Sequence, residues 1–246
     1  MKTTCSILLY FILLPSVVFS QEKGNLSFTL GMAVPGGDYA RADLDKRQTG
    51  FAQSGFCFDI TYAYPFSKHV SAMAMFAFRN NSMNTSAYEA ALEKMYSFPV
   101  YVSATGWTSQ AFLIGPQGTY PLSDQFTLNA YFLFGFLSAT SPEIAQTFDA
   151  PFNLVVQQFS ATKTTGAYRF GVSARYDFGS QFFGLARLDL LSATPNFPDL
   201  VIDSGSGAST SPNTSYSLTM NSVNFSIGMG IRIGKRTLKG TDMALR

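Results

Sequence analysis

Apolar and polar residues alternate one by one along several segments of this chain. The clearest segment carries Phe56, Phe58 and Ile60 on one side of the alternation, and Cys57 and Asp59 on the other. A period of two places the two sets on opposite faces of a β-strand. The same pattern predicts eight strands, near residues 26–33, 56–64, 69–79, 111–120, 126–136, 168–177, 186–190 and 223–232.

The charged residues of these segments fall on one face of the predicted strands. Residues 69–79 are apolar on both faces, and we place Val70, Phe76 and Phe78 with the other apolar rows because that choice turns Arg79 to the polar side. An arginine that faces hydrocarbon at the middle of a membrane costs roughly 2–4 kcal/mol, so this register suits strands with one face on lipid. The polar side then holds the candidate residues of an internal, structural network: Asp59, Arg79, Asn129, Arg169, Arg175, Asp177, Arg187, Asp189 and Arg232.

The composition agrees with a sheet that faces lipid. Only 13% of the residues are charged and 46% are hydrophobic, whereas a soluble domain carries about 25% charged residues. After the first twenty residues no apolar run approaches the roughly 20 residues that a spanning helix needs. We therefore predict an all-β protein, a closed antiparallel up-and-down transmembrane barrel of about eight strands.

The connections between the predicted strands alternate in length. Three are short, at residues 65–68, 121–124 and 179–181. Four are long, roughly at residues 34–55, 80–110, 137–164 and 191–216. Short periplasmic turns and long external loops are the arrangement of outer-membrane barrels. Tyr64, Tyr120 and Tyr176 stand at equal spacing beside the short turns, so we expect them in an aromatic girdle at the periplasmic interface.

The N-terminus has the features of a secretory signal peptide. Lys2 precedes a mostly apolar stretch over residues 7–18, and Ser20 supplies a small residue just before Gln21. This pattern predicts cleavage before Gln21. We expect residues 1–20 to be a cleaved signal peptide. Residues 21–246 would then form a single barrel domain in the bacterial outer membrane, with a short polar C-terminal tail.

The signal peptide, strand count, loop asymmetry and aromatic turn flanks together resemble the small eight-stranded outer-membrane barrels of the OmpA transmembrane domain and OmpX type. The resemblance covers residues 25–233 and implies periplasmic termini and insertion by the barrel-assembly machinery. Two departures stand out. Such barrels commonly end in an aromatic residue, whereas Ile231 and Ile233 precede a polar tail here. That tail is also too short to be a peptidoglycan-binding domain.

The chain has few histidine and cysteine residues, which are common in catalytic and metal-binding sites. His69 is the only histidine and stands beside a short turn, and Cys57 is the only cysteine after residue 20. Membrane-barrel acyltransferases, phospholipases and proteases use a histidine on their outer side or lipid face, so the usual general base is missing. We therefore expect no enzyme activity, no metal site and no cofactor. A net charge of +2 argues against nucleic acid as a partner.

The long loops are mostly polar, with one exception at residues 86–96. Ser86 and Glu89 form a capping-box pattern, and the apolar residues after them share one helical face. A short amphipathic helix is therefore expected in the second external loop. The pattern leaves open whether this helix plugs the barrel mouth, touches a partner, or packs on neighbouring loops, and we favour packing.

Eight strands enclose a lumen just wide enough for side chains. We therefore expect a non-enzymatic barrel with a filled lumen and a structural or surface-interaction role through its external loops. The alternative is a conduit for a small solute or hydrophobic ligand, with the loops shaping a pocket above a plug. A soluble lipocalin-like barrel would need its apolar face turned inward. The expected partners are outer-membrane lipid and the barrel-assembly machinery, the partner of the loops is left open, and a monomer is expected.

Overall fold

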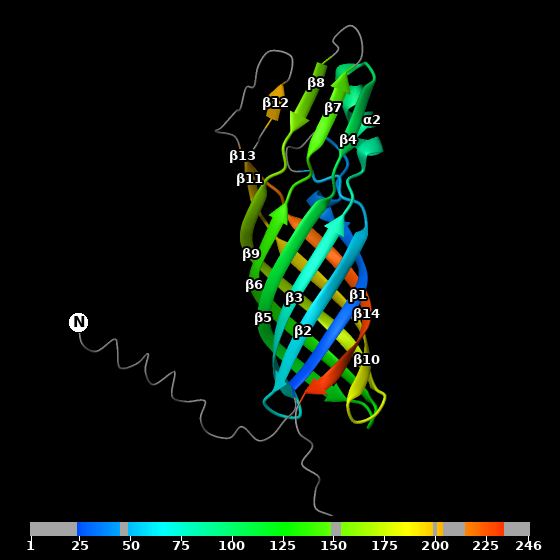
Figure 1. Cartoon of the computed structure of the whole chain (residues 1–246), viewed down its shortest axis with the longest axis vertical. Coiled ribbons are helices and arrows are strands. Elements are labelled where there is room, and N and C mark those ends of the chain that lie inside the picture. The colour runs from blue at the N-terminus through cyan, green and yellow to red at the C-terminus, as the bar shows by residue number, and fades with distance from the viewer. Residues whose placement is uncertain (1–23, 45–48, 149–153, 199–200, 204–214, 234–246) are drawn as a thin grey trace, which may run out of the picture.

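The computed structural model describes residues 24–44, 49–148, 154–198, 201–203 and 215–233. The expected signal peptide and the polar C-terminal tail lie outside the described residues. Eight long strands form a tilted barrel (Figure 1). They are β1 (Gly24–Gly36), β2 (Gly55–Pro65), β3 (Val70–Asn81), β5 (Trp107–Pro121), β6 (Phe126–Thr140), β9 (Thr162–Asp177), β10 (Phe182–Ala193) and β14 (Met220–Ile233).

The barrel is closed and antiparallel. Its strand order is β1-β14-β10-β9-β6-β5-β3-β2, and the first and last strands pair from Gly24 opposite Ile233 to Gly36 opposite Asn221. Closure gives every strand a hydrogen-bonded neighbour on both sides, which is what a sheet needs in order to stand in hydrocarbon. The predicted fold class is confirmed.

All eight predicted strands are present, and several extend beyond their predicted ends. The strand β6 has 15 residues and β9 has 16, whereas about 9–11 residues cross a bilayer as a tilted strand. The short connections occupy residues 66–69, 122–125 and 178–181, all at one end of the barrel. The extra strand length therefore carries the opposite end of the barrel out of the membrane.

The outward rows of the barrel form an apolar belt. Phe132, Phe134 and Phe225 are 50%, 57% and 57% exposed, and most other outward positions along the middle of the strands are also aliphatic or aromatic. At the end with the short turns, Tyr120 and Tyr176 are also exposed. Their position agrees with the expected aromatic girdle.

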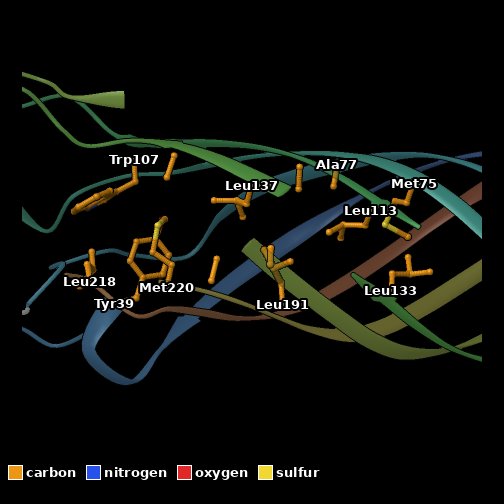
Figure 2. Packing of buried hydrophobic residues seen from close by; sticks show 14 of the residues in the cluster. Tyr39, Met75, Ala77, Trp107, Leu113, Leu133, Leu137, Leu191, Leu218 and Met220 are labelled. Carbon is orange, nitrogen blue, oxygen red and sulfur yellow. The ribbon is translucent and has the colours of Figure 1, made fainter. Parts of the chain in front are cut away.

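The interior of the barrel differs from one side to the other. The inward residues of β3, β5 and β6 are largely apolar and include Met75, Leu113, Leu133 and Leu137, which gather inside the barrel wall (Figure 2). The buried charged residues of the central lumen come mostly from other strands, with Asp59 on β2, Arg169 on β9, and Arg187 and Asp189 on β10, although β10 also turns Leu185 and Leu191 inward. This arrangement explains why residues 69–79 look apolar on both faces, since β3 has lipid on one side and the apolar part of the lumen on the other.

The long connections build a structured head above the barrel, which the sequence did not predict. A four-stranded sheet has the order β12-β8-β7-β4, and β11 pairs with β13 (Figure 1). The expectation of mostly featureless polar loops is therefore wrong. The head strands have only three to five residues each, too few for alternation to stand out. They are β4 (Val100–Ala104), β7 (Ile144–Phe148), β8 (Leu154–Gln158), β11 (Asn196–Pro198), β12 (Val201–Asp203) and β13 (Ser215–Ser217).

Two helical elements complete the described fold. The 3-10 helix η2 (Gly37–Tyr39) follows β1, and the α-helix α2 (Thr85–Tyr96) lies in the head. Among the described residues no helix is long and apolar enough to cross a membrane.

The helix α2 is present as predicted, but its cap differs. Asn84 is the N-cap, and its side-chain oxygen accepts a hydrogen bond from the backbone N–H of Ala87 at 3.0 Å. The predicted Ser86–Glu89 capping box is wrong, because Glu89 instead accepts a bond from the N–H of Val102 in β4 at 2.8 Å. Asn is as good a cap as Ser, and a tertiary contact claims Glu89. The helix packs on β4, which is the favoured one of its three expected roles.

Candidate functional site: the filled lumen and the external cavity

The centre of the lumen is occupied by one fully buried arginine held between two aspartates. Arg169 on β9 donates from Nε to Asp189 Oδ1 at 2.6 Å and from Nη2 to Asp189 Oδ2 at 2.6 Å. The same guanidinium donates from Nη1 and Nη2 to the two oxygens of Asp59 at 2.8 and 2.7 Å. Bidentate pairs of this kind are the strongest that arginine makes. We call these three residues the Arg169 cluster.

Neighbouring side chains complete the hydrogen bonding of the two carboxylates. Tyr131 donates its hydroxyl to Asp189 Oδ2 at 3.0 Å, and the Asn224 amide donates to Asp189 Oδ1 at 2.7 Å. Thr29 reaches Asp59 at 3.5 Å. Every oxygen of the two buried carboxylates therefore accepts at least one hydrogen bond, which buried charges need in order to be tolerated.

Two further arginines flank the Arg169 cluster. Arg187 donates to the hydroxyls of Thr61 and Ser27 at 2.8 and 3.2 Å. Arg79 donates from Nε to Asn224 at 3.1 Å, and its two terminal nitrogens have no hydrogen-bond partner among the described residues. Within the described part of the chain, the central lumen thus holds three buried arginines and two buried aspartates, so its interior is electropositive.

A second charged group lies near the end of the barrel that carries the short turns. Asp177 pairs with Arg232 and lies 3.3 Å from Arg175. Arg175 also sits 5.5 Å from the centre of the Phe183 ring, as a cation–π contact. These side chains are partly accessible, with 18% of Arg175 and 25% of Arg232 exposed.

The structure therefore places all nine sequence-predicted network residues inside the barrel, although in separate groups. Asn129 belongs to neither charged group, since it bonds to Thr119 and Ser173. A cavity of about 30 Å³ beside Asn129 lies between Arg187 and Arg175, which is room for very few water molecules. The lumen is filled by side chains at this level.

The external end of the lumen is closed by an apolar seal, which the sequence did not predict. Tyr39 from η2 and Phe197 from β11 meet the Trp107 ring edge to face, each at 5.7 Å between ring centres. Leu218 and Met220 are buried in the same cluster, and Figure 2 shows Tyr39, Trp107, Leu218 and Met220 together at the barrel mouth. These five residues, here called the mouth seal, come from four distant segments, so alternation within strands could not reveal them.

An external cavity of about 320 Å³ lies between the mouth seal and the head. Its aromatic lining comprises Phe51, Tyr88, Tyr96, Trp107 and Tyr216, and two glutamines, Gln146 and Gln158, also face it. Every described residue of its lining is of an uncharged type. Burial raises the pKa of the Tyr88 hydroxyl to about 12, so this group also stays neutral at physiological pH.

These features define the class of the protein. An apolar belt surrounds a closed barrel, and arginines that would be costly in lipid are paired inside it. The protein is therefore an eight-stranded transmembrane β-barrel. The soluble lipocalin-like alternative is wrong, because it requires the opposite orientation of the two faces.

Comparison with solved structures returns outer-membrane proteins. The chain is similar to Ail, the attachment invasion locus protein of Yersinia pestis, with 12% identity and a TM-score of 0.47 over 87% of this chain and 99% of that one. A major outer membrane protein from Thermus thermophilus is 8% identical, with a TM-score of 0.48 over 85% of this chain and 99% of that one. Neisserial surface protein A is 8% identical, with a TM-score of 0.44 over 85% of this chain and 97% of that one. No protein-family model and no curated protein sequence matches the chain significantly. The chain's own geometry, with its closed barrel, apolar belt and internal charges, defines it as a transmembrane barrel.

Proposed function

We propose that this protein is a non-enzymatic outer-membrane barrel that acts at the cell surface through its head. The observation that carries the proposal is the filling of the lumen at two levels, by the Arg169 cluster and by the mouth seal. A barrel filled in this way is a rigid support. The elaborate part of the molecule is the head, which stands on the side away from the short turns.

The state of the candidate catalytic groups supports a non-enzymatic role. The carboxylates of Asp59, Asp189 and Asp177 are all engaged by guanidinium groups, and a paired carboxylate is a poor general base. The ring of His69 is exposed beside a short turn, where its Nδ1 lies 3.2 Å from the carbonyl oxygen of Thr119. Cys57 is fully buried in the lumen wall.

The proposal also covers the surroundings of the barrel and its assembly. Outer-membrane lipid covers the apolar rows, insertion occurs through the barrel-assembly machinery, and the protein works as a monomer.

The second candidate function is a conduit for a small solute or a hydrophobic ligand. The observation that favours it is the external cavity, which lies directly above the lumen and shares Trp107 with the mouth seal. Passage beyond the cavity would require the mouth seal and the Arg169 cluster to move.

Electrical recording separates the two candidates. The purified protein in planar bilayers is expected to show no stable conductance steps, because side chains from all eight strands fill the lumen. A porin inserted in the same membrane serves as the positive control. Stable steps from the purified protein would contradict the filled-lumen function and favour the conduit.

The exposure of the head is tested by labelling intact cells. Tyr101→Cys in β4 and Leu122→Cys in a short turn both place a thiol at an exposed position, while the native Cys57 is buried. A membrane-impermeant maleimide is expected to label the Tyr101→Cys variant on intact cells. The Leu122→Cys variant should react only after the outer membrane is permeabilised. The reverse pattern would place the head in the periplasm and refute a surface role.

A further inference from the structure

We infer that the external cavity is a binding site for a small uncharged aromatic alcohol or phenol. The inference goes beyond the proposed function, and it does not depend on whether the lumen conducts. Its basis is the combination of volume, uncharged described lining, aromatic side chains and a pair of hydrogen-bonding groups in one cavity that opens to the surface of the head.

The volume of the cavity suits a small ligand. Binding pockets occupy about 300–1,000 Å³, and this cavity, at about 320 Å³, lies at the lower end. Met95 and Tyr96 at the end of α2 line it and are 56% and 46% exposed. The rim therefore lies at the outer surface of the head, where a solute can enter.

The lining selects against charge. A charged ligand would lose its hydration in this cavity, and none of the described lining residues offers a side chain of opposite charge. A neutral ligand is therefore the one that the lining accommodates.

Two adjacent polar groups can hold a hydroxyl group of the ligand. The Gln146 amide donates a hydrogen bond to the Tyr88 hydroxyl oxygen at 3.2 Å. Tyr88 therefore keeps its own proton for donation, and Gln146 keeps its carbonyl oxygen as an acceptor. The hydroxyl group of an alcohol or phenol can accept a hydrogen bond from Tyr88 and donate one to the carbonyl oxygen of Gln146. A hydrocarbon could form neither hydrogen bond.

The aromatic side chains supply the apolar part of the site. Phe51 packs edge to face on Tyr88 with 5.0 Å between ring centres, and the indole N–H of Trp107 donates to the carbonyl of Gly50 at 2.8 Å. These contacts fix the rings that border the cavity before any ligand arrives. A preformed aromatic wall favours a flat ligand ring, which loses little entropy on binding.

The single tryptophan of the chain provides a local reporter. Trp107 is the only tryptophan in the sequence and lines the cavity. A bromine atom quenches indole fluorescence only at close range. We therefore propose titrating the folded protein in detergent with 4-bromobenzyl alcohol and with 4-bromobenzoate, which share a ring and a bromine but differ in charge.

The expected result is saturable quenching by the alcohol and at least tenfold weaker apparent binding of the carboxylate. In the Gln146→Glu variant the affinity for the alcohol should fall at least tenfold. The new carboxylate accepts the hydrogen bond from the Tyr88 hydroxyl, so this donor is lost to the ligand, and it adds a negative charge to the cavity lining. Gln157→Glu is the matched control, since it makes the same change at an exposed position of the neighbouring strand β8.

Two outcomes would overturn the inference. One is equal, non-saturating quenching in all three proteins, which would indicate partitioning into detergent. The other is equal binding of the carboxylate and the alcohol. Heat-modified gel migration checks that each variant is folded. Conductance reports on the lumen and quenching on the cavity, so this inference and the proposed function can fail separately.

Discussion

Replacement of Arg169 by methionine is expected to destabilise the folded barrel by about 3–5 kcal/mol, the cost of removing one partner from a buried ion pair. The change leaves Asp59 and Asp189 in the lumen without the guanidinium group that donates hydrogen bonds to both carboxylates. Methionine fills much of the same volume, so the loss would report on charge rather than on a cavity. Urea unfolding in detergent, followed by the fluorescence of Trp107, measures the effect.

The surface of the same protein offers a matched control for this change. Arg41 also lies between two aspartates, Asp38 at 2.7 Å and Asp43 at 3.8 Å, but it is 32% exposed. Exposed pairs contribute about 0–1 kcal/mol, so Arg41→Met should lower the free energy of unfolding by less than about 1 kcal/mol. Similar losses in the two variants would mean that the Arg169 cluster is no more important than a surface pair.

The second large effect is expected on the lipid face. Phe132 lies near the middle of the membrane-crossing part of β6 and is 50% exposed. An arginine at the bilayer midplane costs roughly 2–4 kcal/mol, so Phe132→Arg should sharply lower the yield of folded barrel. Heat-modified gel migration of isolated membranes measures that yield.

The head again supplies the control. Tyr101 is an exposed aromatic residue of β4, outside the belt, and Tyr101→Arg introduces the same charge in water. This variant should assemble like the parent protein. If Phe132→Arg assembled equally well, the outward row of β6 would not face hydrocarbon.

The charged residues show how far a local pattern can go. The cost of placing Arg169 or Arg187 in lipid depends on one residue and one face, so the inward side of each strand could be predicted from alternation together with the positions of the charged residues. The partners could not be predicted in the same way. Asp177 is on the same strand as Arg169, yet Arg169 pairs with Asp59, 110 positions away, because the stagger of the closed barrel decides which side chains meet across the lumen.

The head and the cavity lay beyond prediction for a related reason. The strand β4 has five residues, and its pairing with β7 forms only when residues 100–104 and 144–148 are brought together above the barrel. Glu89 is a further example of a contact between distant segments. The sequence predicts it as part of a helix cap, but its carboxylate accepts a hydrogen bond from Val102 in β4 instead. The mouth seal and the external cavity arise from several segments at once, so no single segment carries their signal.

The sequence by itself determined the number of barrel strands, the face of each barrel strand that meets lipid and the end of the barrel with short turns. These properties follow from periodicity, charge and connection length, all of which are local. The tertiary structure alone decided which charges pair, that one side of the lumen is apolar, and that the long connections fold into a head with a neutral cavity. These properties depend on contacts between segments far apart in the chain, and the closure and stagger of the barrel set those contacts.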